Sequence, residues 1–262
     1  MSLKTTLLLI PLLPLAAAVI AGLLRKQVGR AGSHWVAILG VGVSFLLSAW
    51  VLYQQIYLGL ETQNISIYTW MVVDGIRFEL GFLIDHLTAL MMTVVTFVAL
   101  MVHIYTIGYM AKDPGYQRFF SYIALFTFSM LMLVMANNFL QLFFGWEAVG
   151  LVSYLLIGFW FDRESAIYAG LKAFLVNRVG DFGFLLGIAA VLYSFGSLDY
   201  ATVFAQAPDI VGKTVAIIPG LEWQWITVIC VCLFIGAMGK SAQAPLHVCC
   251  PIRWKARPRS PP

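Results

Sequence analysis

Charged residues are scarce in this sequence. Asp, Glu, Lys and Arg make up 11% of its 262 residues, and hydrophobic residues make up 61%. A soluble domain has roughly 25% charged residues. The mean hydropathy is +0.88. A chain this poor in charge cannot cover a water-facing surface, so the composition excludes an ordinary soluble protein and indicates a chain embedded in a lipid bilayer.

Cysteine is also rare. Cys230 and Cys232 lie within an apolar run, and Cys249 and Cys250 are adjacent near the C-terminus. Neither pair has the spacing of a zinc or iron–sulfur site, so we expect buried, inert thiols. A glycine-rich nucleotide loop is missing as well. The sequence therefore predicts no metal site and no cofactor in this chain, and the net charge of +4 gives no reason to expect a nucleic-acid partner.

Long apolar runs dominate what is present. A bilayer core of about 30 Å needs about 20 residues of helix. About seven segments satisfy or nearly satisfy this length: Leu3–Leu24, His34–Tyr57, Phe82–Tyr105, Phe119–Ala136, Asn138–Phe161, Ala169–Phe195 and Trp223 onward. They predict an all-α, polytopic transmembrane helical bundle as the membrane domain, residues 1–248. Only Asn137 and Asn138 separate the fourth and fifth segments, which indicates a tight connection there.

One segment between the second and third helices has a different pattern. Residues 65–79 are rich in β-branched and aromatic side chains around an Asp74-Gly75 pair. This is the signal of a short β-hairpin. We expect it outside the membrane.

The basic residues predict an orientation. Cytoplasmic loops of membrane proteins are enriched in Lys and Arg. The loops after helices one, three and five hold most of them: Arg25, Lys26, Arg30, Lys112, Arg118 and Arg163. The opposite side holds Lys4, Arg77 and Lys213. The N-terminus and the acidic loop Asp199–Glu222 are therefore expected on the periplasmic side, with Trp70, Trp223 and Trp225 as interfacial anchors.

Several ionisable residues interrupt the apolar spans. A charge at the bilayer centre costs at least about 2.5–3.5 kcal/mol, so such residues point to function. Glu147 lies near the middle of the fifth span. On the sixth, Arg178 and Asp181 are three residues apart and share a helix face, which allows a structural ion pair. Lys172, on the same helix, needs another partner.

Lys240 follows an apolar run that begins at Trp225, which places its ammonium near the bilayer midplane. Pro245 removes an N–H from the next turn, and small residues surround Lys240. We therefore expect a broken seventh helix with Lys240 at the break, as occurs at ion sites in transporters. His247 lies just past the break.

The chemistry that Glu147, Lys172, Lys240 and His247 permit is proton relay. Burial makes an amine lose its proton more readily, and a nearby carboxylate opposes this. Histidine changes its charge near neutral pH. The alternative is that these charges only form ion pairs that hold the bundle together, and this alternative is strongest for Arg178 with Asp181.

Three stretches together resemble a known family: NNFLQLFFGWEAVGLVSYLLIGFW, LKAFLVNRVGDFGF and GKSAQAPLHV. They are similar to the antiporter-like proton-pumping subunits of respiratory complex I, of the subunit L or chain 5 type. The resemblance covers Met1–Val248 and implies the N-terminal repeat of an inverted-repeat fold. Glu147 then matches the family's essential glutamate, Lys240 its central lysine on the broken helix, and Arg178 and Asp181 its helix-six pair.

The resemblance also implies a function and partners. The function is proton translocation coupled to electron transfer from NADH to quinone. NADH, FMN, iron–sulfur clusters and quinone would be bound by other subunits, and the partners would be other membrane-arm subunits and the lipid bilayer. The expected location is the bacterial inner membrane, or the mitochondrial inner membrane for an organellar chain. A subunit of a multi-subunit cation/proton antiporter or of a membrane-bound hydrogenase is the alternative.

The family pattern ends at Val248. Residues 249–262 read CCPIRWKARPRSPP, whereas a reading frame shifted by one inserted guanine gives WLPDSMEGPTPISA, as the family pattern requires. We expect this tail to arise from a frameshift and to be disordered. A further alternative is therefore an inactive truncated fragment.

Overall fold

The computed structural model describes residues 3–73, 76–218 and 221–249. The predicted turn Asp74-Gly75 and the predicted disordered tail, except Cys249, lie outside these residues. The chain forms two compact units. The first comprises Met1–Tyr68, Glu79–Asn137 and Phe144–Leu156, and the second comprises Thr69–Phe78, Asn138–Phe143 and Ile157–Pro262.

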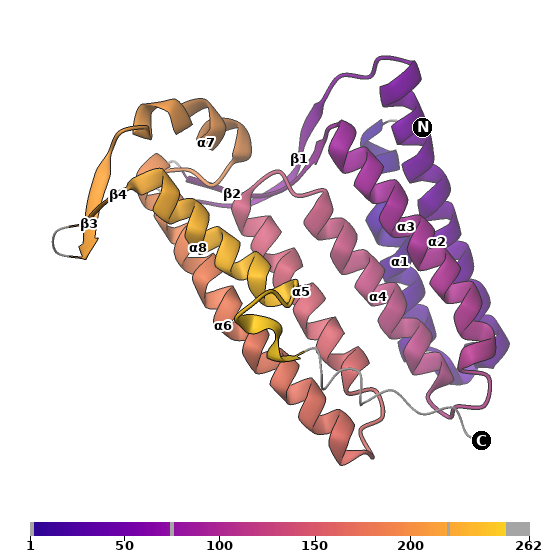
Figure 1. The fold of residues 1–262 in the computed structure, drawn as a ribbon. Coiled ribbons are helices and arrows are strands. Elements are labelled where there is room, and N and C mark those ends of the chain that lie inside the picture. The colour runs from indigo at the N-terminus through magenta and orange to yellow at the C-terminus, as the bar shows by residue number, and fades with distance from the viewer. Residues whose placement is uncertain (1–2, 74–75, 219–220, 250–262) are drawn as a thin grey trace. The chain divides into compact units, whose positions relative to one another are not determined.

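The first unit is built on four packed helices (Figure 1). They are α1 (Leu3–Leu23), α2 (Arg25–Tyr57), α3 (His86–Tyr109) and α4 (Tyr116–Val134). Most of α5 (Phe139–Ile157) also belongs to this unit. Helix α2 packs on α1, α3 and α4. The apolar core of this unit includes Leu7, Ile10, Val51, Met92 and Leu131.

Two prolines interrupt the hydrogen bonding of α1 without ending it. Pro14 has no N–H, so the carbonyl of Ile10 loses its helical donor. The fully buried Ser44 of α2 replaces that donor, since its Oγ donates to the Ile10 oxygen at 2.7 Å. In a bilayer every backbone group must be satisfied internally, so this bond links α2 to α1 at the point where α1 needs it.

Helix α2 begins earlier than predicted. It starts at Arg25 rather than His34 and contains a non-helical residue, Gly29, with a φ of 69°. Arg30 directly follows this kink, and its guanidinium donates to the carbonyl oxygens of Ala111 at 3.0 Å and Asp113 at 2.8 Å. The α1–α2 end of the unit is thereby tied to the connection between α3 and α4.

The predicted hairpin is present and longer than expected. Strands β1 (Gln63–Val73) and β2 (Ile76–Ile84) form a two-stranded sheet. The predicted start of the third span at Phe82 was wrong because Phe82 lies in β2 and bridges Ala136. Helix α3 begins only after Asp85, whose carboxylate accepts from the N–H of Thr88 at 2.7 Å and caps the helix.

A polar cluster holds the base of this hairpin to the end of α4. The Asn137 side chain donates to the Oδ1 atom of Asn64 at 3.0 Å and to the Oε1 atom of Glu79 at 3.2 Å. Ser66 donates to the other Glu79 oxygen at 2.9 Å. Asn137 is almost completely buried. The predicted tight connection between the fourth and fifth helices is thus a bonded corner.

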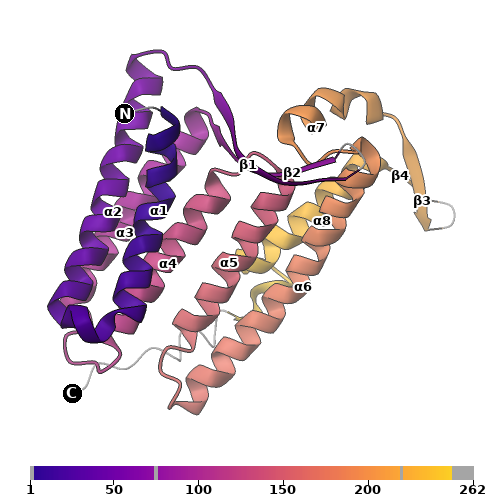
Figure 2. The ribbon, with the colours of Figure 1, turned by 180° about the vertical axis from the view of Figure 1, so that it is seen from behind.

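The second unit is organised around two helices that pack along each other (Figure 2). These are α6 (Glu164–Phe195) and α8 (Trp225–Lys240). Between them lie α7 (Tyr200–Gln206), the 3-10 turn Ala207–Ile210, and a small sheet of β3 (Thr214–Ile218) and β4 (Leu221–Gln224). The sequence predicted only an acidic loop there, so this α7 and β3–β4 segment was missed.

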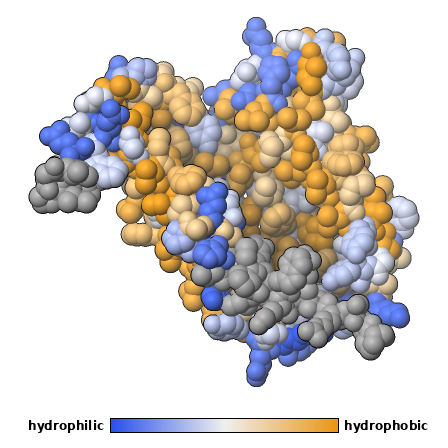
Figure 3. Space-filling view, viewed as in Figure 1, coloured by the Kyte–Doolittle hydropathy of each residue, from blue (hydrophilic) through white to orange (hydrophobic). Residues whose placement is uncertain are grey.

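The described helices fit a membrane protein. Six of them are long and apolar enough to span a bilayer, and α8 is a shorter apolar helix that accounts for the seventh predicted segment. On the face shown in Figure 3, apolar side chains cover most of the helical surface and hydrophilic ones gather mainly toward the helix ends. Large exposed hydrophobic side chains occur on both units. The chain is therefore a multi-pass membrane protein.

Candidate functional site

Glu147 lies near the midpoint of α5, where the sequence predicted it. Two residues before it, and so on roughly the opposite side of the helix, Gly145 lets α5 approach α4 closely, since a Cβ on Gly145 would lie 2.8 Å from the Cα of Leu133. Glu147 is half-buried, and its Oε1 atom is shielded from solvent. A carboxylate at this depth in an apolar helix is the residue type that proton transfer requires.

Lys240 is the last residue of α8. The N–H of Ser241 donates to the carbonyl of Ala237 at 2.9 Å, and the N–H of Gln243 donates to Met238 at 3.1 Å. The chain then turns and forms a 3-10 helix at Leu246–Cys249. The prediction of a helix interrupted between Lys240 and Leu246 is confirmed, and the half-buried Lys240 stands at the interruption.

The helix that carries Lys240 is held against α6 by a glycine contact that the sequence reading missed. A Cβ placed on Gly180 would lie 3.0 Å from the Cα of Gly239 and 3.2 Å from the carbonyl oxygen of Ile235. Both glycines are buried. Lys240 and Asp181 directly follow these glycines, so the contact fixes the backbone positions from which both charged side chains extend. Small residues spaced three to four apart on two apolar helices were the available signal.

The charged residues of α6 have distinct surroundings. Asp181 is 5% exposed and so belongs to the buried face of the helix. The Arg178 guanidinium lies 4.6 Å from the centre of the Phe174 ring, a cation–π contact. Lys172 is half-buried, further toward the start of the helix. The ion pair expected between Arg178 and Asp181 stays a prediction.

His247 lies in the 3-10 helix that follows the interruption, and this turn packs on α6. Its side chain is exposed. Glu147 belongs to the first unit, whereas the other five predicted site residues belong to the second: Lys172, Arg178, Asp181, Lys240 and His247. Their roles as a relay stay a prediction.

The cysteines of α8 differ from expectation. Cys230 is exposed rather than buried, and Cys232 is half-buried. The reason is that α8 buries only its glycine-lined stripe, which leaves the remaining apolar side chains at the surface.

Comparison with known proteins supplies the family. A family model described as NADH-Ubiquinone oxidoreductase (complex I), chain 5 N-terminus matches residues 70–120. A second, described as NADH:quinone oxidoreductase/Mrp antiporter, TM, matches residues 136–258. NADH-quinone oxidoreductase subunit L of Neisseria meningitidis serogroup B is 62% identical over 249 residues, which cover 94% of this chain and 37% of that protein. The chain belongs to the subunit L and chain 5 family.

Other members of the subunit L and chain 5 family are also similar. NADH-ubiquinone oxidoreductase chain 5 of Rhizopus stolonifer is 43% identical over 239 residues, which cover 91% of this chain and 35% of that protein. The chain thus spans little more than a third of the length of these relatives. Among solved structures, the Mrp complex of Dietzia sp. has a TM-score of 0.76 at 23% identity, with 95% of this chain and 25% of that chain covered. This likeness shows the antiporter-like fold.

Proposed function

We propose that this chain corresponds to the N-terminal part of a membrane-arm subunit of NADH:quinone oxidoreductase, a proton-translocating enzyme, and that it takes part in moving the protons. The observation that carries this proposal is the placement of Lys240 at the interrupted end of an apolar helix that packs on α6, the helix of the buried Asp181. Ionisable groups at membrane depth are costly and mark ion pathways. Subunit L relatives at 62% identity support complex I more strongly than an Mrp-like structure at 23% identity does.

In this proposal four residues pass the proton in steps. Glu147 accepts a proton within α5, and Lys172 and Lys240 change their charge in response, because a neighbouring carboxylate stabilises a protonated amine and burial opposes it. The exposed His247 exchanges the proton with water. Arg178 and Asp181 hold α6 in position and do not themselves carry the proton.

The remaining parts of the activity belong to other subunits in this proposal. NADH, FMN, the iron–sulfur clusters and quinone are bound there, and this chain contacts other membrane-arm subunits. The membrane is the bacterial inner membrane, or the mitochondrial inner membrane for an organellar chain. The support for these statements is the naming of the relatives as NADH-quinone and NADH-ubiquinone oxidoreductase subunits.

Glu147→Gln, introduced at the chromosomal locus, tests the relay. The amide keeps the shape of the side chain and cannot carry the proton. Proton uptake per NADH oxidised by membrane vesicles is expected to fall by at least about tenfold, since a positioned acid or base contributes typically 10²–10⁴-fold. The matched control is Glu61→Gln, because Glu61 is exposed and lies outside the spans.

Assembly is followed separately through NADH oxidation by an artificial acceptor, which needs no proton movement. Unchanged proton uptake in Glu147→Gln vesicles would show that Glu147 is structural. Proton uptake that requires sodium ions, together with a failure to oxidise NADH at this locus, would favour a cation/proton antiporter instead.

A further inference from the structure

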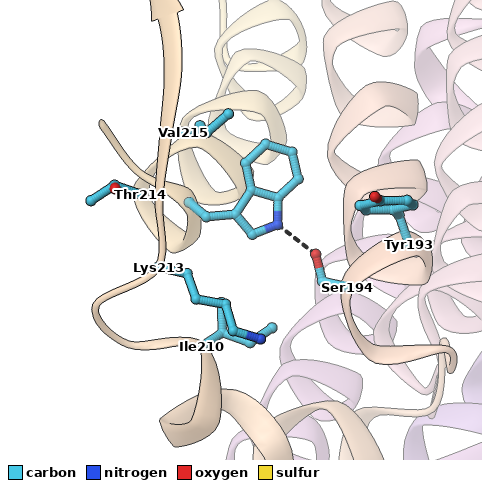
Figure 4. Close-up of a pocket in the computed structure, with 7 residues that line it drawn as sticks. Tyr193, Ser194, Ile210, Lys213, Thr214 and Val215 are labelled. Carbon is cyan, nitrogen blue, oxygen red and sulfur yellow. Dashed lines mark hydrogen bonds between the residues drawn. The ribbon is translucent and has the colours of Figure 1, made fainter. Parts of the chain in front are cut away.

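A cavity of about 400 Å³ opens where α6 ends and α8 begins, within the second unit. Its walls include Tyr193 and Ser194 from the last turn of α6, and Lys213 from the segment before β3 (Figure 4). Trp225, the first residue of α8, forms a further wall. None of these side chains takes part in the proposed proton relay.

The cavity is held in shape by hydrogen bonds. The indole N–H of Trp225 donates to Ser194 Oγ at 2.6 Å, and that hydroxyl donates to the carbonyl of Ala190 at 2.7 Å. The backbone N–H of Trp225 donates to the carbonyl of Lys213 at 2.9 Å, and the N–H of Lys213 donates to Ile210 at 3.1 Å. These bonds fix the indole on one side and place Lys213 at the rim.

The cavity lies at the C-terminal end of α6, a helix long and apolar enough to span a bilayer, so we infer that it lies near a membrane surface. Trp and Tyr concentrate at that depth because they have an apolar ring and a polar edge. Tyr193 is 87% exposed and is therefore available to a lipid. The Lys213 ammonium supplies the positive charge that a phosphate group requires.

The charge of the surrounding segment narrows the choice of lipid. Residues 196–224 contain Asp199, Asp209 and Glu222, and Lys213 is their one basic residue. Asp209 and Glu222 are exposed. A lipid with a net negative charge would be attracted by Lys213 and repelled by this acidic segment. A zwitterionic lipid fits both Lys213 and the acidic segment. Its phosphate binds Lys213, and its ammonium lies near the carboxylates and the aromatic faces.

We propose that this cavity binds the head group of a zwitterionic phospholipid such as phosphatidylethanolamine, with the lipid phosphate on Lys213 and an acyl chain along Tyr193. This inference rests on α6 and α8 lying in the membrane and does not depend on proton transfer. The lipid head group would fill the space between α6, α8 and the β3–β4 hairpin.

Photo-crosslinking in nanodiscs tests the proposal with the 262-residue chain. Phosphatidylethanolamine carrying a diazirine beside the head group is expected to label peptides that contain Tyr193 and Lys213. Lys213→Gln should lower this labelling by up to about fivefold, the change that the loss of one exposed ion pair accounts for. Lys213→Arg keeps the charge and should retain the labelling. The control Lys4→Gln removes an exposed cation of the opposite end of the chain and should leave labelling unchanged.

Three outcomes would overturn the proposal. The first is equal labelling of Lys213→Gln and wild type, with both folded by circular dichroism. The second is stronger labelling by a phosphatidylglycerol probe, which would indicate an anionic lipid. The third is loss of the label on addition of inorganic phosphate, which would indicate a site for a free anion.

Discussion

Gly180 of α6 and Gly239 of α8 meet backbone to backbone. A Cβ built on either residue would lie 3.0 to 3.1 Å from the Cα of the other. The neighbouring atoms are main chain, which cannot move aside as the end of a flexible side chain can. In a bilayer, where the hydrophobic effect does not drive helices together, such close packing is a main source of helix association. The position of Lys240 therefore depends on two residues that carry no functional group.

Gly180→Ala is expected to push α8 away from α6. Overpacking of this kind costs about 1–3 kcal/mol. The melting temperature of the purified protein should fall, and proton uptake by vesicles should fall with it because Lys240 is displaced. Gly108→Ala is the matched control, since a Cβ on that helical glycine meets nothing within 4 Å. Equal melting temperatures for the two variants would refute the contact.

Apolar length was enough to find the spans, and it could not fix their ends. Helix α3 starts after Asp85 because the carboxylate caps it, whereas hydropathy alone started that span at Phe82. The run Thr214–Ile218 has a β-branched pattern, yet it is too short to stand out within an acidic segment. The helix break at Lys240 could be predicted because proline and glycine disrupt a helix through their own local backbone geometry, which the sequence shows directly.

Contacts between segments that are distant along the chain could not be predicted from the sequence. Nothing near Ser44 indicates that its hydroxyl serves the carbonyl of Ile10, and nothing near Gly180 indicates that Gly239 faces it. Both depend on how two helices lie against each other. The charged candidates were visible because ionisable residues in apolar runs are anomalous, whereas the residues that position them are ordinary.

Ser44→Ala should destabilise the first unit more than Ser48→Ala does. Both serines are fully buried on α2. Ser48 donates to the carbonyl of Ser44 in its own helix, whereas Ser44 donates to the Ile10 carbonyl that Pro14 deprives of a donor. Losing the bond from Ser44 leaves the buried carbonyl oxygen of Ile10 without a hydrogen-bond donor, at a cost of about 1–3 kcal/mol. Unfolding in SDS followed by circular dichroism measures the difference, and equal stabilities of the two variants would contradict it.

Asn137→Ala should loosen the hairpin. The substitution removes donors to Asn64 and Glu79 and leaves the Glu79 carboxylate with one fewer partner. The expected loss of stability is about 1–3 kcal/mol. Limited proteolysis between Gln63 and Ile84 should become faster, whereas the exposed control Thr62→Ala should leave its rate unchanged. Protection equal to that of the wild type would show that the strands are held by other contacts.

The phenol of Tyr200 should make the stability of the protein depend on pH in the alkaline range. Tyr200 lies on α7, outside the spans, with its ring 4.8 Å from that of Phe139 in an edge contact. Burial raises the pKa of Tyr200 above its usual value of 10.0. The unfolded chain therefore loses this proton near pH 10 while the folded chain keeps it.

Above pH 10 the unfolded state then binds fewer protons, so the free energy of unfolding falls as the pH rises, by up to ~1.4 kcal/mol per pH unit from this group. Below pH 10 both states hold the proton and the group contributes no slope. Tyr200→Phe keeps the ring contact and removes the titration, so its stability should decline less steeply between about pH 9.5 and 11.5. Tyr57→Phe, at a residue that is 73% exposed, should follow the wild-type curve. SDS unfolding across this pH range measures the slopes, and a Tyr200→Phe curve parallel to the wild type would show that the phenol reaches water in the folded protein.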